Sequence, residues 1–304
     1  MKILGVIPAR LAATRFPDKP MKPILGIPMV GHCYFRSKLS KLVDEVYVAT
    51  CDQEIIDYVE EIGGKAIMTS NVHERATERT AEALLNIEHL NAETKYDLVV
   101  MIQGDEPLVD PSMIDDALRP LLNGDKQVSN LKDSLTTRSD VENPNNVKVV
   151  MGINGDALYM SREPIPSKEK YSNEIEYFRQ LGLIAFTREA LLNFIKLEMT
   201  KLEIIESVDM NRFLENGIPI HMVETTLEVD AVDTPDDLED INTDTISNGV
   251  IVFVISEEAL FRWSSTQNKW IQIAGSNAAN WKGAVNEYIK DVKSKDFPNE
   301  KEQY

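Results

Sequence analysis

Short apolar runs alternate with amphipathic stretches from Met1 to about Asn123. The apolar runs have the length of strands, and the stretches between them repeat apolar residues at helical spacing. Strands that alternate with covering helices are typical of a parallel sheet in an α/β fold. The pattern predicts strands at Ile3–Ile7, Glu45–Thr50, Lys65–Met68 and Leu98–Ile102, and helices at Met29–Leu39, Gln53–Ile62 and Thr77–Leu90.

The pattern changes in the middle of the chain. Polar and apolar residues alternate from Gln127 to Met160 around Asn143-Pro144-Asn145, which indicates an antiparallel segment. The later part predicts helices at Arg188–Ile195 and Ile204–Glu215, a strand at Ile218–Val223 and a helix capped by Thr234. We therefore expect one α/β unit over residues 1–242, with a mixed, mainly parallel sheet and helices on both faces.

The composition shifts after Asn242, where a short polar run has the character of a linker. All three tryptophans follow it. We expect a small, separate α+β module over residues 249–304, whose aromatic residues form its own core rather than a docking patch. Its predicted elements are strands at Val250–Ile255, Ala259–Trp263 and Lys269–Ile273 and a helix at Trp281–Val292.

Charge restricts the partners of this chain. The 304 residues include 32 Lys and Arg against 50 Asp and Glu, a formal net charge of −18. A nucleic acid would be repelled by this average field, so we expect no nucleic acid partner, and any phosphate site must be a local positive pocket. The two cysteines cannot form a disulfide scaffold, and neither a secretory signal nor an apolar run of membrane-spanning length is present. We expect a cytoplasmic protein without membrane insertion.

The loop after the first predicted strand is the strongest candidate for such a pocket. It places Arg10, Arg15 and Lys19 within ten residues, among prolines that restrict where the cations point. Loops at the carboxyl ends of strands bind ligands in open α/β sheets, and Arg and Lys can hold a polyphosphate there. The alternative interpretation is a solvated basic turn.

Two carboxylates follow predicted strands elsewhere in the chain. Asp105 lies beside a glycine directly after Leu98–Ile102, where it could bind Mg²⁺ or simply form a turn. Asp233 precedes a predicted helix, where it could bind the same ion or favour the helix dipole. Together with the three cations, the pair provides what metal-assisted phosphoryl or nucleotidyl transfer requires.

Six motifs in one order carry a family resemblance. The chain resembles the 3-deoxy-manno-octulosonate cytidylyltransferase (CMP-Kdo synthetase) family over about residues 1–242. The motifs are Pro8-Ala9-Arg10 with Arg15 and Lys19-Pro20, Thr77-Glu78-Arg79, Gln103-Gly104-Asp105-Glu106-Pro107, Asn143-Pro144-Asn145 with Val147-Lys148-Val149-Val150, Ala157-Leu158-Tyr159 with Ser161-Arg162 and Pro164-Ile165-Pro166, and Val232-Asp233-Thr234-Pro235 with Asp237-Leu238.

This resemblance implies a nucleotide-diphospho-sugar transferase-like fold and a reaction in which CTP and a 3-deoxy-2-ulosonic acid give a CMP-sugar and pyrophosphate. It implies the following roles for residues of this chain: Arg10, Arg15, Lys19 and Thr77 bind the nucleotide, Asp105 and Asp233 bind Mg²⁺, and Gln103 and Arg162 bind the acidic sugar, with Lys19 and the two aspartates as the catalytic set. We also expect a homodimer.

The chain departs from the family pattern at several positions. The family usually has His-x-Ser-Gly-Thr-Glu-Arg, and this chain has Arg75-Ala76 in place of the Ser-Gly pair near the expected cytosine pocket. Gln180 replaces a histidine, and Asp209-Met210 replaces a Glu-Gln pair that faces the sugar. With Gln180 and Asp209 as sugar-binding residues, the substrate is Kdo or a modified relative such as 8-amino-Kdo. The alternatives are a nucleotidyltransferase for another base or acidic sugar, and a non-catalytic nucleotide-binding assembly protein.

Overall fold

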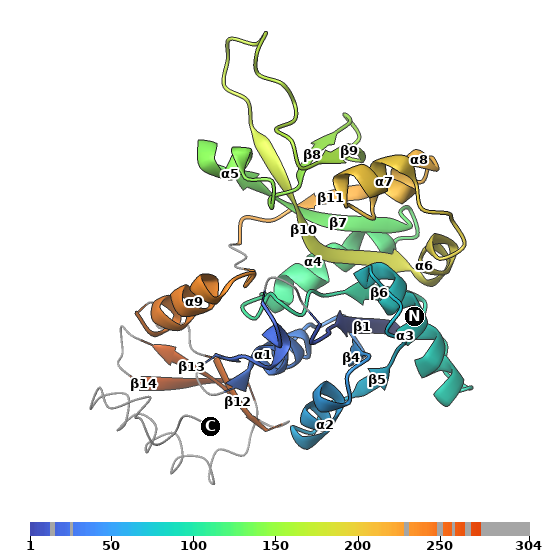
Figure 1. The fold of residues 1–304 in the computed structure, drawn as a ribbon. Helices are drawn as coiled ribbons and strands as arrows, with labels where there is room; N and C mark the ends of the chain where they lie inside the picture. The colour runs from blue at the N-terminus through green and yellow to red at the C-terminus, as the bar shows by residue number, and fades with distance from the viewer. Residues whose placement is uncertain are drawn as a thin grey trace. The chain divides into compact units, whose positions relative to one another are not determined.

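The chain divides into two compact units, Met1–Pro235 and Asp236–Tyr304. The computed structural model (Figure 1) describes residues 1–12, 16–24, 27–227, 231–247, 252–256, 259–264 and 269–274. None of the helices in these ranges has the length and apolar character needed to cross a membrane.

Nine strands of the described part of the first unit form one mixed sheet. Across the sheet the order is β11-β7-β10-β6-β1-β4-β5, and β8 pairs with both β10 and β9. Strands β6, β1, β4 and β5 are parallel neighbours, whereas β10 runs antiparallel to β6, β7 and β8. The strands are β1 (Ile3–Pro8), β4 (Glu45–Thr50), β5 (Ala66–Met68), β6 (Leu98–Met101), β7 (Val128–Leu135), β8 (Lys148–Met151), β9 (Ala157–Ser161), β10 (Tyr177–Thr187) and β11 (His221–Glu224). Strands β2 (Pro23–Ile24) and β3 (Ile27–Pro28) form a separate pair.

Helices cover both faces of this sheet because successive strand residues point to opposite faces. In β1, Leu4 and Val6 join one apolar cluster with α3, α6 and α8, and Ile3 and Ile7 join a second cluster with α1, α2 and α4. The helices are η1, a 3-10 turn (Lys19–Met21), α1 (Met29–Ser37), α2 (Gln53–Glu61), α3 (Ala76–Leu90), α4 (Pro111–Leu122), α5 (Arg138–Glu142), α6 (Arg188–Phe194), α7 (Lys201–Glu206) and α8 (Asn211–Glu215). The α/β class with a mixed sheet and helices on both faces is confirmed.

The predicted helix at Ile204–Glu215 is wrong. The chain forms two short helices there, α7 and α8, because Ser207 adopts a left-handed backbone conformation with φ 52° and ends α7. Val208 and Met210 then turn into the core, where they are 5% and 0% exposed. Helix α4 and strand β10 were not among the predicted elements, although β10 lies in the middle of the sheet.

The described part of the second unit contains an antiparallel sheet of β12 (Val252–Ser256), β13 (Ala259–Ser264) and β14 (Lys269–Ala274). These strands confirm the three that the sequence predicts in this region. Helix α9 (Pro235–Ser247) begins after Thr234, as predicted. The predicted helix at Trp281–Val292 lies outside the described residues, and the boundaries and role of the module stay predictions.

Candidate functional site

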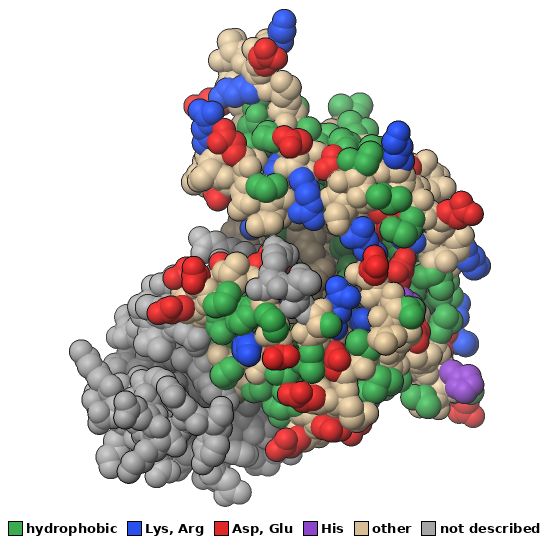
Figure 2. Space-filling view, in the orientation of Figure 1, with side chains coloured by type: hydrophobic (Ala, Val, Ile, Leu, Met, Phe, Trp, Pro, Cys, Tyr) green, Lys and Arg blue, Asp and Glu red, His purple; other side chains and the backbone are tan. Residues whose placement is uncertain are grey.

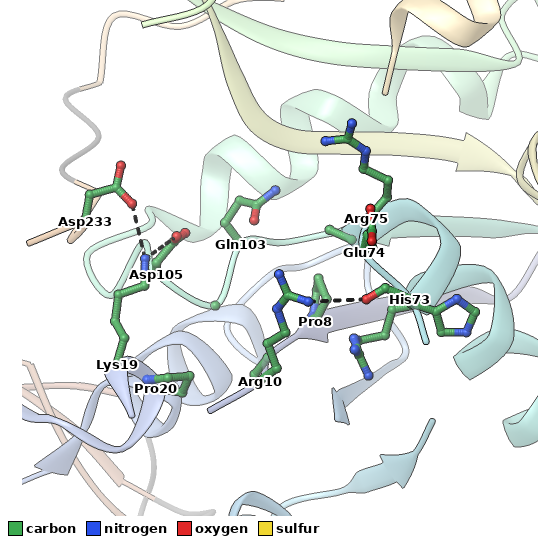
Figure 3. Close-up of a pocket in the computed structure, with 14 residues that line it drawn as sticks. Pro8, Arg10, Lys19, Pro20, His73, Glu74, Arg75, Gln103, Asp105 and Asp233 are labelled. Atoms are coloured by element: carbon green, nitrogen blue, oxygen red, sulfur yellow. Dashed lines mark hydrogen bonds and ion pairs between the residues drawn. The ribbon is translucent and has the colours of Figure 1, made fainter. Parts of the chain in front are cut away.

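A cavity of about 280 Å³ lies where the loops after β1 and β6 meet. The two strands are parallel neighbours, so their carboxyl ends open at the same edge of the sheet. Figure 3 shows that Arg10, Lys19, Gln103, Asp105 and Asp233 surround this space. Half of the predicted site residues, from three separate segments of the chain, are therefore brought together.

An ion cluster forms one end of the cavity. The Lys19 ammonium donates to Asp105 Oδ2 at 2.7 Å and to Asp233 Oδ1 at 3.3 Å. A backbone bond of 2.9 Å from Val232 N to Asp105 O holds the two acidic segments together. All three charged side chains remain partly accessible, with exposed fractions of 14%, 29% and 34% for Lys19, Asp105 and Asp233. These three side chains carry one positive and two negative formal charges.

Gly104 lets the acidic loop approach the end of β1. A Cβ atom at this position would lie 2.8 Å from the carbonyl oxygen of Pro8, closer than real Cβ atoms come to backbone. Any side chain here would push the loop, and with it Asp105, away from Lys19. This crowding explains why position 104 is occupied by glycine.

A second acid, Glu106, directly follows Asp105 in this loop. Glu106 is 5% exposed, and burial, reinforced by the negative charge of Asp105, raises its pKa to about 8. At neutral pH Glu106 is mostly protonated. Of the two acids in this loop, Asp105 is the one that contacts a cation, the Lys19 ammonium.

Asp105 and Asp233 fit a magnesium ion that is shared with a substrate. Both carboxylates already converge on one cation, the Lys19 ammonium. No group of three or more His, Cys, Asp and Glu side chains in the described ranges could form a complete protein cage for a metal. Mg²⁺ is commonly bound by one or two carboxylates together with substrate phosphate oxygens and water, which is the donor set that this pair leaves open.

Basic residues line the opposite end of the cavity, near the start of α3. Arg10 Nη1 donates to the carbonyl oxygen of His73 at 3.4 Å, and the His73 imidazole is itself hydrogen-bonded to Glu82. Arg75 and Arg79 line the same end. Figure 2 shows Lys and Arg side chains beside the hollow in the middle of this face. The cavity therefore offers cations to an anion in spite of the acidic average charge.

Gln103 is fixed against the central strand by a close contact. Its Nε2 donates to the carbonyl oxygen of Gly182 at 3.1 Å. A Cβ at position 182 would lie 2.1 Å from Gln103 Cγ, so only glycine leaves room for this side chain. The β10–β7 pairing is interrupted between Gln180 and Ile184, and the buried Asn130 side chain donates to the carbonyl oxygens of Leu181 at 2.7 Å and Leu183 at 3.1 Å.

Arg162, which the resemblance assigns to the sugar, does not line the cavity. Its Nε donates to Glu206 O at 2.7 Å and its Nη1 to Pro144 O at 2.8 Å. The fully buried Lys148 lies beneath, and its ammonium donates to Asn143 O at 3.0 Å, to Asn146 O at 2.8 Å and to the carbonyl oxygen of Arg162. These contacts place both side chains in a polar network that orders the loop after β9.

Thr77 and Asp209 are brought together, but away from the cavity lining. The Thr77 hydroxyl, which is fully buried, donates to Asp209 Oδ2 at 2.7 Å. Gln180 lies at the irregular part of β10 and also does not line the cavity. Met210 was expected to face the sugar, but it is buried in the core at 0% exposure, so that expectation is wrong. Arg15 lies outside the described residues.

The sequence reasoning missed Gly182 and Asn130, which position Gln103 and the central strand. A glycine inside a strand is a recognised signal of close backbone approach, so Gly182 could have been found. Nothing in the pattern distinguishes Asn130 from an ordinary strand residue, because its role arises only from the interrupted pairing with β10.

The family described as cytidylyltransferase matches residues 4–226 of this chain. The chain is 40% identical over 252 residues to a 3-deoxy-manno-octulosonate cytidylyltransferase of Geobacter metallireducens, covering 79% of this chain and 96% of the relative. It is 41% identical over 242 residues to the enzyme of the same name from Fusobacterium nucleatum, with coverage of 79% and 96%.

Solved structures agree with these sequence similarities. A CMP:2-keto-3-deoxy-manno-octonic acid synthetase complexed with CTP is 34% identical and superposes with a TM-score of 0.74, covering 81% of this chain and 99% of that protein. A cytidylyltransferase from Leptospira borgpetersenii superposes with a TM-score of 0.53 at 16% identity, covering 81% and 87%, and that likeness concerns the fold alone.

Proposed function

Because this chain belongs to the 3-deoxy-manno-octulosonate cytidylyltransferase family, we propose that it transfers the cytidylyl group of CTP to the acidic sugar Kdo and releases pyrophosphate, for lipopolysaccharide synthesis. One observation carries the assignment of the site: Lys19 bridges Asp105 and Asp233 in a cavity whose other end is basic. The 34% identical structure in complex with CTP supports a nucleotide in the same fold.

We propose that the charged residues of the cavity bind and orient the phosphates of the nucleotide. Arg10 and Lys19 would hold the triphosphate, with Arg15 from the same loop, while Asp105 and Asp233 would hold Mg²⁺. Bound there, the ion would offset the negative charge that develops on the phosphate oxygens. Release of Lys19 from the two carboxylates would let its ammonium turn to the leaving phosphates.

The reaction itself needs no covalent enzyme intermediate. The anomeric hydroxyl oxygen of the sugar attacks the α-phosphorus in line, the bond from that phosphorus to the bridging oxygen of the β-phosphate breaks, and pyrophosphate carries that electron pair away. The hydroxyl proton passes to solvent. Gln103, held rigidly by Gly182, would orient the sugar for this attack.

The remaining predicted residues are proposed to act around the sugar. Arg162, Gln180 and Asp209 lie outside the cavity lining, so we propose that they order the walls that the sugar contacts when it binds. Thr77, which donates to Asp209, is proposed to serve the nucleotide. The departures at Gln180 and Asp209 keep a modified relative of Kdo, such as the 8-amino sugar, as a second candidate substrate.

A pyrophosphate-release assay tests this function. The full-length protein is incubated with Mg²⁺, each of the four nucleoside triphosphates, and either Kdo or 8-amino-Kdo. We expect turnover only with CTP and release of one pyrophosphate for each CMP-sugar formed, with EDTA abolishing it. Preference for another nucleotide would contradict the base assignment, and absence of turnover with both sugars would contradict the function.

We further propose a cytoplasmic homodimer whose C-terminal module, residues 249–304, is dispensable for catalysis. Light scattering coupled to size-exclusion chromatography measures the mass directly. A mass of about twice the 34.3 kDa of the chain is expected, and the mass of a single chain would contradict the dimer.

A further inference from the structure

Three side-chain contacts join the first turn of α3 to the segment of α7 and α8. Arg75 Nη1 donates to Ser207 Oγ at 2.9 Å, the Thr77 hydroxyl donates to Asp209 at 2.7 Å, and Arg212 Nη2 donates to Glu78 at 3.1 Å. These partners are 132 to 134 residues apart in the chain. We call this row of contacts, from Arg75–Ser207 to Glu78–Arg212, the α3 clamp.

Arg75 is the member of the clamp that also lines the cavity. Within the described ranges its ion-pair partner is Glu203, which lies 3.9 Å from Arg75 Nε and already accepts hydrogen bonds of 2.7 Å and 2.6 Å from Arg212. The Arg75 Nε itself is buried without a hydrogen-bond partner. A guanidinium in this state keeps its position chiefly through Ser207.

Ser207 is the point at which the clamp can shift the segment between α7 and α8. It has a left-handed backbone conformation that costs a residue other than glycine about 1 kcal/mol or more, so surrounding contacts must hold it. Arg75 holds its hydroxyl, and Arg162 Nη2 donates to its carbonyl oxygen at 3.3 Å. Two arginines, one of them in the cavity lining, thus converge on one strained turn.

We propose that Arg75 is a positioning residue that sets the affinity for the acidic sugar, by holding the turn at Ser207 and the adjoining Asp209 against the start of α3. The inference rests on the proposed function, because it assigns the wall at 206–210 to the sugar. The nucleotide is held mainly by the loop after β1, so loosening the turn should affect the two substrates unequally.

The test compares Arg75→Ala, Ser207→Ala and the double variant with the wild type in steady-state kinetics. We expect KM for Kdo to rise about tenfold in each single variant and no further in the double variant, since both changes remove one contact. KM for CTP should stay within about twofold in Ser207→Ala, which leaves the Arg75 charge in the cavity lining. Ser207→Asn, which tolerates the left-handed conformation and keeps an acceptor for Arg75, should restore most of the sugar affinity. Arg138→Ala, an arginine whose side chain is 89% exposed, is the matched control.

A second measurement does not depend on turnover. Hydrogen exchange of the unliganded protein should become faster at residues 203–212 in Arg75→Ala and Ser207→Ala, and stay unchanged in Arg138→Ala. Unchanged exchange in that segment, a rise of KM for CTP alone, or additive effects in the double variant would overturn the role of Arg75. A wild-type protein that turns over neither sugar would instead refute the proposed function, while the exchange experiment would still decide whether the clamp holds the turn.

Discussion

Two ion clusters stand at opposite ends of β6 and have similar ingredients. At the carboxyl end, the Lys19 ammonium bridges Asp105 and Asp233. At the other end, Glu88 accepts two hydrogen bonds from Arg188, at 2.9 Å and 2.8 Å, one of 3.0 Å from Lys95 and one of 3.2 Å from the backbone of Tyr96.

The two clusters differ in how fully their carboxylates are hydrogen-bonded and in how exposed these carboxylates are. The Glu88 side chain is 2% exposed and its oxygens are fully engaged, whereas the two aspartates near Lys19 are 29% and 34% exposed beside a cavity. A saturated, buried carboxylate contributes to folding and has nothing left for a ligand. An accessible group of charges can exchange its internal partner for a substrate or an ion. We expect substitutions in the first cluster to cost activity and those in the second to cost stability.

The largest effect should come from the two aspartates. Asp105→Asn and Asp233→Asn keep the shape of the side chain but remove a ligand charge, so each should lower kcat/KM by about 100- to 1000-fold. The midpoint of thermal unfolding should change little, and the concentration of Mg²⁺ needed for half-maximal activity should rise. If Asp233→Asn alone remains fully active, Asp233 serves only the start of α9.

Lys19→Ala should have the next largest effect on activity, about 2–4 kcal/mol of transition-state stabilisation, because it removes a preorganised cation for the phosphates. Lys95→Ala is its matched control, since it removes a lysine from the other cluster. The two variants are compared by kcat/KM for CTP and by denaturant unfolding. Equal values of kcat/KM for CTP in the two variants would contradict the role of Lys19 in phosphate binding.

Glu88→Gln should reverse this pattern and destabilise the fold by about 2–3 kcal/mol at pH 7, with kcat nearly unchanged. Burial alone would raise the pKa of Glu88, but the hydrogen bonds from Arg188, Lys95 and Tyr96 outweigh it and lower the pKa to about 2 from 4.5. Because the pKa is lower in the folded state, this stabilisation is present above about pH 4.5 and is lost as the pH falls toward 2. Urea unfolding at pH 7 and pH 3 measures the free energy of unfolding of the wild type and of Glu88→Gln. We expect the difference between the two proteins to be smaller at pH 3, and an equal difference at both pH values would contradict the prediction.

The smallest effect should follow truncation after Asn248, because both ion clusters lie within the first compact unit. The shortened protein should retain kcat/KM within about twofold and unfold cooperatively. An inactive or insoluble product would mean that the first unit requires residues 249–304.

The sequence predicted the parallel part of the fold well because its signals are local. Each strand there is a continuous apolar run followed by a helix, and the carboxyl ends of parallel neighbours meet, which brings Arg10, Lys19 and Asp105 together. Helix α4 was missed although Asp110 caps it, with a 2.8 Å bond to Ser112 N, and proline follows at its first position. That signal was available.

The structure of the antiparallel part depends on contacts between residues far apart in the chain, which a local sequence pattern does not reveal. The turn at Ser207 carries no glycine or proline, so the apolar spacing from Ile204 to Glu215 fitted one helix. Its break depends on distant partners, Arg75 and Arg162. The pairing of β10 with β7 is interrupted between Gln180 and Ile184, and the place of β10 among β6, β7 and β8 is set by pairing rather than by periodicity. The same reason explains why Thr77 and Asp209 met each other instead of lining the cavity.

Lys148 can report on the motion of the loop after β9, in the antiparallel part of the fold. Its ammonium is fully buried under carbonyl oxygens of Asn143, Asn146 and Arg162, so an amine-acylating reagent can reach it only when the loop after β9 lifts. The rate at which Lys148 is acylated, read by mass spectrometry of its peptide, therefore records the opening of that loop. Exposed lysines such as Lys201 in the same digest calibrate the reagent.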